Sequence, residues 1–125
     1  MFISNLFLRT GVIALLVGIL IGMWMGGTGA WEFRHAHAHT NLVGWASMMI
    51  YGFFYRLFPK AGASRLGKVH AGFAIPGLVL MLGGTIATTA GGSFLLVQVA
   101  GELLMGISAV IFAIVLFKAT ARQAD

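Results

Sequence analysis

Four long apolar stretches constrain this chain more than any other feature of its sequence. Each is about twenty residues long, the length that a helix needs to cross the hydrocarbon core of a bilayer. Of the 125 residues, 59% are hydrophobic and only 9% are charged. The sequence therefore predicts one all-α integral membrane domain, residues 1–125, with four transmembrane helices at Leu6–Met25, Ala38–Phe58, Val69–Ala90 and Phe94–Phe117.

The connections between these stretches are short, so an antiparallel four-helix bundle in the lipid bilayer is expected. Basic side chains flank the second connection and mark the two termini: Arg9, Arg56, Lys60, Arg65, Lys68, Lys118 and Arg122. Because cytoplasmic segments carry an excess of lysine and arginine, both termini are predicted to be cytoplasmic, in a multi-pass protein of the plasma (inner) membrane. The same rule accounts for the net charge of +5, so nucleic acid is not an expected partner.

Three of the four histidines, His35, His37 and His39, lie within five residues at the start of the second apolar stretch. The orientation predicted from the charges places them on the outer side of the membrane. A helix turns by about 100° per residue, so His35 and His39 share one face and His37 points almost the opposite way. A single-ion site that uses all three from one helix is therefore not expected. Two sites, or one site shared between two copies, fit this geometry better.

The two histidine faces continue differently along the second stretch. Below His39 the face is an apolar wall, made of Val43, Ala46, Ile50, Phe53 and Leu57. Below His37 the face has less bulk, because it is made of Asn41, Gly44, Met48 and Gly52. The space at Gly44 suits either a flat cofactor or a neighbouring helix, and Met48 is a candidate soft axial ligand.

Glu102 is the one acidic residue inside a predicted span. A carboxylate at that depth costs about 3 kcal/mol or more unless it is paired, protonated or bound to a metal. By depth, His37 or His39 is its expected partner, and Gln98, one turn earlier, extends the polar network. Imidazole and carboxylate groups suit copper and zinc, so one hypothesis is a site for one of these ions built from His35 and His39 with Glu102 or with a histidine of another chain.

Several other residues are predicted to serve structure. Two overlapping GxxxG spacings form a surface for close helix approach, within the chain or between subunits, at Gly18, Gly22 and Gly26. His70 begins the third span on the cytoplasmic side and is expected to be a solvated interfacial residue. Tyr51 and Tyr55 are expected to belong to the aromatic belt at a membrane surface.

The second stretch also carries a resemblance to a known family. Its motif runs His39-Thr40-Asn41-Leu42, then Trp45, Gly52-Phe53, Tyr55 and Pro59. It resembles the second helix of the catalytic subunit of the heme–copper oxidase superfamily, most closely the nitric-oxide reductase branch. His37-Ala38-His39 with Gly44-Trp45 is also similar to a pattern in small four-helix proteins related to oxidase subunit I. The later spans match more loosely through glycines, such as Gly77, Gly101 and Gly106.

The catalytic subunit of that family has twelve helices in three arcs of four, and this chain has the length of one arc. The resemblance implies that His39 is an axial ligand of a low-spin heme b, and that His37 and His39 serve two different hemes. A homotrimer would rebuild the ring of twelve helices, with His39 of one chain and His37 of the next at each interface. Two imidazole ligands saturate the iron and suit electron transfer.

The chain departs from the family in having no second histidine pair for a copper or non-heme iron centre. One chain therefore lacks a complete binuclear catalytic site, and whether the protein is an enzyme stays open. The predicted function is a membrane heme b protein for electron transfer or for heme or gas binding at subunit interfaces. A quinol or a cytochrome is the expected class of electron donor. The alternatives are a copper- or zinc-binding membrane protein and an accessory subunit without a cofactor.

Overall fold

The computed structural model describes residues 1–121, and every element in this part of the chain is helical. Three helices are long and apolar enough to cross a membrane: α1 (Phe2–Thr28), α5 (Arg65–Thr89) and α6 (Leu95–Ala121). They correspond to the first, third and fourth predicted spans. Arg122, which contributed to the predicted orientation, lies outside the described residues.

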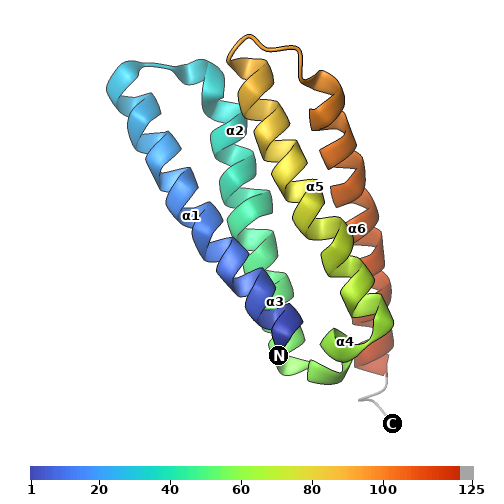
Figure 1. Ribbon diagram of the computed structural model, residues 1–125. Coiled ribbons are helices and arrows are strands. Elements are labelled where there is room, and N and C mark those ends of the chain that lie inside the picture. The colour runs from blue at the N-terminus through green and yellow to red at the C-terminus, as the bar shows by residue number, and fades with distance from the viewer. Residues whose placement is uncertain (122–125) are drawn as a thin grey trace.

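The second predicted span, Ala38–Phe58, is not one regular helix. After a single 3₁₀ turn, η1 (Trp31–Phe33), it consists of α2 (Arg34–His39), the π-helical η2 (Thr40–Ser47) and α3 (Met48–Leu57). These three pieces follow one another without a break and form one rod in Figure 1. The Ser47 hydroxyl donates to the carbonyl of Leu42, five residues earlier, at 3.0 Å, which matches the wide turn of a π-helix. None of the three pieces is by itself a candidate span, so a membrane crossing by this rod stays a prediction.

Proline ends the second rod as its position predicts. Pro59 cannot continue a helix, and Phe58 before it has left helical geometry, with φ −117° and ψ 67°. Pro59 instead opens the short helix α4 (Pro59–Ala63) at its first position. Helix α5 then starts behind Ser64, whose hydroxyl accepts a hydrogen bond from the Gly67 N–H at 3.0 Å.

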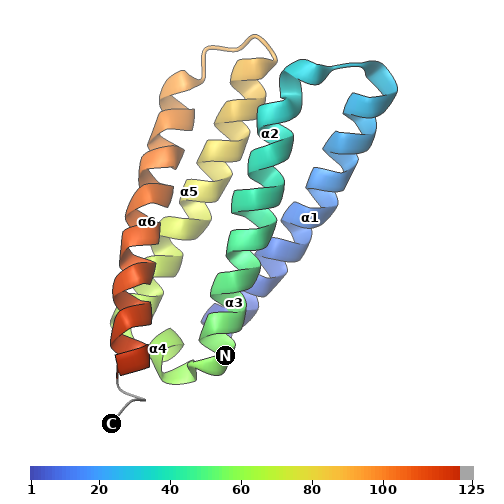
Figure 2. The same ribbon diagram turned by 180° about the vertical axis from the view of Figure 1, so that it is seen from behind.

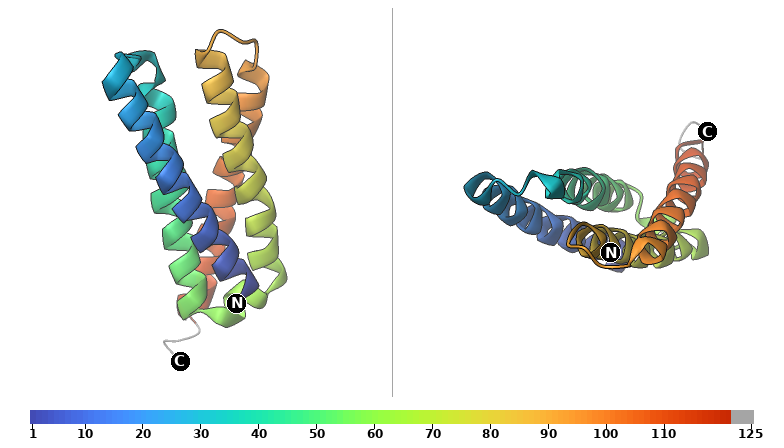
Figure 3. Two further views of the ribbon diagram at one scale, coloured as in Figure 1. Left: turned by 60° about the vertical axis from the view of Figure 1, so that its left-hand side comes forward. Right: turned by 90° about the horizontal axis from the view of Figure 1, so that it is seen from above.

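The rods form two antiparallel hairpins. Helix α1 packs along η2 and α3, and α5 packs along α6 (Figures 1 and 2). In Figure 3 the two hairpins spread apart at the end that carries η1 and the α5–α6 connection, and converge at the end that carries α4. We call these the histidine end and the α4 end.

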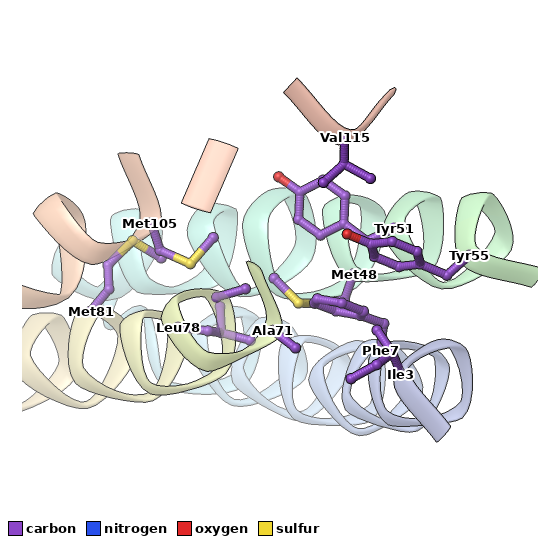
Figure 4. Close-up of a cluster of buried hydrophobic side chains, with 11 residues drawn as sticks. Ile3, Phe7, Met48, Tyr51, Tyr55, Ala71, Leu78, Met81, Met105 and Val115 are labelled. Atoms are coloured by element: carbon purple, nitrogen blue, oxygen red, sulfur yellow. The ribbon is translucent and has the colours of Figure 1, made fainter. Parts of the chain in front are cut away.

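The core lies between the two hairpins, with its aromatic members toward the α4 end (Figure 4). Its buried members come from α1, α3, α5 and α6: Ile3, Phe7, Met48, Tyr51, Tyr55, Ala71, Ala74, Leu78, Met81, Met105 and Val115. The aromatic side chains of this core thus lie inside the protein, where they contact residues of all four rods.

Candidate functional site

His37 is half-buried between α2 and α1 and has a defined orientation. Its Nδ1 atom lies 2.9 Å from the carbonyl oxygen of Gly18, and because a carbonyl only accepts, Nδ1 carries the proton and donates it. Asn41 donates from Nδ2 to the backbone carbonyl of His37 at 2.9 Å. A Cβ on Gly22 would lie 2.7 Å from Cε1 of this ring. The absence of a side chain at Gly22 therefore leaves the space that the His37 imidazole occupies.

The GxxxG surface of α1 accordingly packs inside the chain. A Cβ on Gly18 would lie 2.5 Å from Oδ1 of Asn41, and Gly22 faces His37. Gly26, the third glycine of the series, would meet nothing within 4 Å. Gly18 and Gly22 thus allow the start of the second rod to pack closely against α1. Gly26 leaves an uncovered surface on α1.

His39 is held in a similar way on another side of the rod. Its Nδ1 lies 2.8 Å from the carbonyl oxygen of His35 and donates to it. His39 is half-buried and His35 is exposed, whereas His37 contacts α1. The predicted separation of the histidines onto opposite faces is confirmed.

These two hydrogen bonds fix the chemistry that His37 and His39 present. Because Nδ1 carries the proton in each ring, Nε2 keeps its lone pair. Neither Nε2 belongs to the fully buried side-chain atoms that lack a partner, so neither atom is completely enclosed. Metal-bound histidines in proteins are usually arranged in this way, with one nitrogen donating to a carbonyl and the other bound to the metal.

The space beside the glycines of the His37 face is occupied by helix α1. A Cβ on Gly44 would lie 2.8 Å from Cβ of Ala14, and one on Gly52 would lie 2.7 Å from the Leu8 side chain. Met48, on the same face, is fully buried in the core. The low bulk of this face thus permits close packing of two helices.

Glu102 lies exposed on α6 and has a neutral partner. Gln98 donates from Nε2 to Oε1 of Glu102 at 3.0 Å, as their spacing of one turn predicts. The carboxylate borders an apolar groove of about 430 Å³ along α6, which includes Leu103 and Ile107.

A metal site within one chain is not formed. Across residues 1–121, no three histidine, cysteine, aspartate or glutamate side chains come together in a way that could hold an ion. His35, His39 and Glu102 of one chain therefore do not form the predicted copper or zinc site, and the alternative that uses a histidine of another chain stays a prediction. His35 and His39 belong to one hairpin and Glu102 to the other, and the hairpins are spread apart at this end (Figure 3).

A second polar pair, missed at the level of sequence, lies buried at the α4 end. Tyr55 Oη and His70 Nδ1 are 2.8 Å apart, and His70 is fully buried. The ring of Phe7 stacks on the imidazole at 4.9 Å between centroids, and Tyr51 meets it edge-on at 4.7 Å. The expectation of a solvated His70 is wrong, and so is the expectation that Tyr51 and Tyr55 form an interfacial belt.

The sequence does contain a signal for this burial. His70 shares one face of α5 with a run of small residues that pack inward, Gly67, Ala71, Ala74 and Gly77. Rotation about the helix axis, not distance along the span, therefore decides where a side chain near the end of a span lies. The Nε2 atom of His70 has no hydrogen-bond partner and is enclosed, so this pair links helices and offers no open ligand position.

Comparison with protein-family models, with curated proteins and with solved structures found no match for this chain. The resemblance to the heme–copper oxidases therefore rests on the sequence motif from His37 to Pro59 and on the looser glycine matches in the later helices.

Proposed function

We propose that this chain is a membrane protein that binds heme b between copies of itself and transfers electrons. The ligands would be His37 of one copy and His39 of the next. The observation that carries the proposal is the state of the two rings: each donates Nδ1–H to a backbone carbonyl and keeps the lone pair of an Nε2 that is not fully enclosed. This is the form in which imidazole ligates heme iron.

The arrangement of the ligands favours a site between chains. His37 and His39 are two residues apart on a helix, so their rings leave opposite sides of the rod and do not converge on one iron. The face below His39 ends in large exposed apolar residues, with Ile50, Phe53 and Leu57 each more than half exposed. Such a surface suits contact with another copy in the bilayer. A homotrimer, resembling the twelve-helix ring, would place one ligand pair at each interface.

The surface near His37 has room for a flat group. Gly26 lies one turn beyond Gly22 on α1, and an added Cβ there would meet no atom within 4 Å. Backbone carbonyls of the same chain would orient the two imidazole ligands. The Gly18 carbonyl fixes the ring of His37, and the His35 carbonyl fixes the ring of His39.

A heme with two imidazole ligands supplies reversible one-electron chemistry at an iron with no open coordination position. Electron transfer therefore fits this ligand set better than reduction of oxygen or nitric oxide does. The donor that suits a membrane protein of this kind is a quinol or a cytochrome.

An absorption spectrum tests the proposal. The protein is produced in heme-replete cells, purified in mild detergent, and measured oxidised and after reduction with dithionite. We expect sharp α and β bands on reduction. Each of the variants His37→Ala and His39→Ala should lose them, whereas His35→Ala, which alters an exposed ring in the same segment, should keep them.

Four outcomes would overturn the proposal. A colourless protein, or unchanged bands in both ligand variants, contradicts heme binding by these residues. Stoichiometric copper or zinc without iron would instead favour an ion site shared between copies. Unchanged assembly and associated activity in the double variant His37→Ala/His39→Ala would favour an accessory subunit.

A further inference from the structure

A groove of about 630 Å³ lies at the α4 end, at the opposite end of the molecule from His35, His37 and His39. It is formed by the first turns of α1, the end of α4 and the first half of α5. Its walls are mainly apolar and include Phe2, Leu6 and Ile75, and Lys68 supplies the charged side chain of the lining. A volume between about 300 and 1,000 Å³ is typical of sites that bind small molecules.

The chain leaves part of this groove unfilled. An added Cβ at Gly72, which lines the groove, would meet no atom within 4 Å. Pro76, one turn further on and also in the lining, has no N–H to bond the Gly72 carbonyl, so that carbonyl loses its partner within the helix. The groove therefore combines apolar walls with a bare stretch of helix, and a ligand can enter beside Gly72.

The end of the molecule that holds the groove is positively charged. Besides Lys68 it carries Arg56, Lys60 and Arg65, all exposed. Within residues 1–121 the acidic side chains are Glu32, in η1, and Glu102, in the half of α6 nearer the histidine end. Among residues 1–121, no carboxylate side chain near the groove offsets this positive potential.

We propose that this groove binds an anionic phospholipid of the cytoplasmic leaflet. One acyl chain would lie along Phe2, Leu6 and Ile75, and the phosphate would meet Lys68. The excess of lysine and arginine predicts that the α4 end faces the cytoplasm, whose leaflet carries the anionic lipids. The charge of the rim complements the headgroup, and the apolar walls complement the chain. This inference does not depend on heme binding.

Lipid binding by the purified full chain tests the proposal. The protein is delipidated in mild detergent and then titrated with phosphatidylglycerol or with phosphatidylcholine of the same acyl chains, and adducts are counted by native mass spectrometry. We expect phosphatidylglycerol to be retained in preference. The variant Lys68→Gln should lower its retention about fivefold and leave phosphatidylcholine unchanged. Gly72→Leu should lower the retention of both lipids, because its side chain occupies the groove.

Two matched variants make the outcome decisive. Lys118→Gln removes a charge at the same end of the molecule but outside the groove lining. Gly83→Leu adds the same side chain to α5 at another position where a Cβ meets nothing within 4 Å. Both should bind as the unaltered chain does. Equal losses in Lys68→Gln and Lys118→Gln, equal retention in Gly72→Leu and Gly83→Leu, or no preference for the anionic lipid would each overturn the proposal.

Discussion

A buried imidazole needs a partner for each of its nitrogens, and His70 has a partner for only one. Tyr55 satisfies Nδ1, while Nε2 is enclosed without a hydrogen bond. The rings of Phe7, Tyr51 and Phe112 surround the imidazole and supply the remaining contacts. Since an unsatisfied polar group in an apolar interior is costly, the Tyr55–His70 bond carries more of the stability than an exposed hydrogen bond would.

Removing the Tyr55 hydroxyl therefore has a definite expected cost. Tyr55→Phe keeps the ring stack and leaves both nitrogens of His70 without a partner, so we expect a loss of about 1–3 kcal/mol in the free energy of unfolding. Thermal unfolding in detergent measures it. Tyr51→Phe is the matched control, because the Tyr51 hydroxyl makes no hydrogen bond among the described side chains, and its melting temperature should change little. Equal melting temperatures for the two variants would contradict this account.

The single-residue predictions succeeded where rotation about a helix axis was considered and failed where only depth was. The turn of 100° per residue correctly separated His37 from His39. Depth along the span placed His70, Tyr51 and Tyr55 in an interfacial zone, although they lie on inward faces. The carbonyl partners of the two histidines were not predictable, since they depend on the approach of α1 and on side-chain torsions that a sequence pattern does not specify.

At the scale of whole elements, the close pairing of α5 and α6 depends on glycines that face the partner helix. An added Cβ on Gly84 would lie 2.5 Å from the backbone nitrogen of Gln98, and one on Gly77 would lie 3.0 Å from Cβ of Leu104. Gly101 faces the backbone of Met81 from the other side. Small residues at such positions let two backbones approach within a membrane, where packing drives association.

Substitution of two adjacent glycines of α5 tests how much the close approach of α5 and α6 contributes to stability. Gly84→Ala pushes α6 away from α5 and should cost about 1–3 kcal/mol, as overpacking of a tight interface does. Gly83→Ala adds the same methyl group one residue earlier, where nothing lies within 4 Å, and should be close to neutral. Melting temperatures of the two variants in the same detergent provide the comparison. A neutral Gly84→Ala would mean that the two helices can separate at little cost.

Element positions were predictable from hydropathy because length and apolar content define a membrane-spanning helix. Three spans follow from these two properties, and the end of the second rod follows from the position of Pro59. The division of the second rod by η2 could not be predicted in this way, because α-helical and π-helical turns have similar residue composition. The π-helical turn depends instead on local hydrogen bonds, such as that from Ser47 to the Leu42 carbonyl. The short helix α4 was missed because five residues are too few to show a periodic pattern.

At the scale of the whole molecule, the two hairpins spread apart at the histidine end and place Glu102 on a different hairpin from His35, His37 and His39 (Figure 3). Polar groups exposed on apolar helices are costly in a bilayer and mark surfaces that meet a partner. Helical patterns predict which residues share a face within one chain. The way in which copies associate depends on the relative affinities of their surfaces, which helical patterns in one sequence do not predict. The trimer therefore remains part of the proposed function.

The proposed sharing of each heme between copies makes a prediction that no site within one chain can imitate. A His37→Ala chain and a His39→Ala chain, with different tags, are co-expressed, and trimers holding both are isolated by two affinity steps. Each chain alone lacks one ligand at every interface. In a cyclic trimer of mixed chains, one interface always joins an intact His37 to an intact His39, so about a third of the wild-type α-band intensity should return. Mixed trimers as colourless as the single variants would show that the two histidines do not act across an interface.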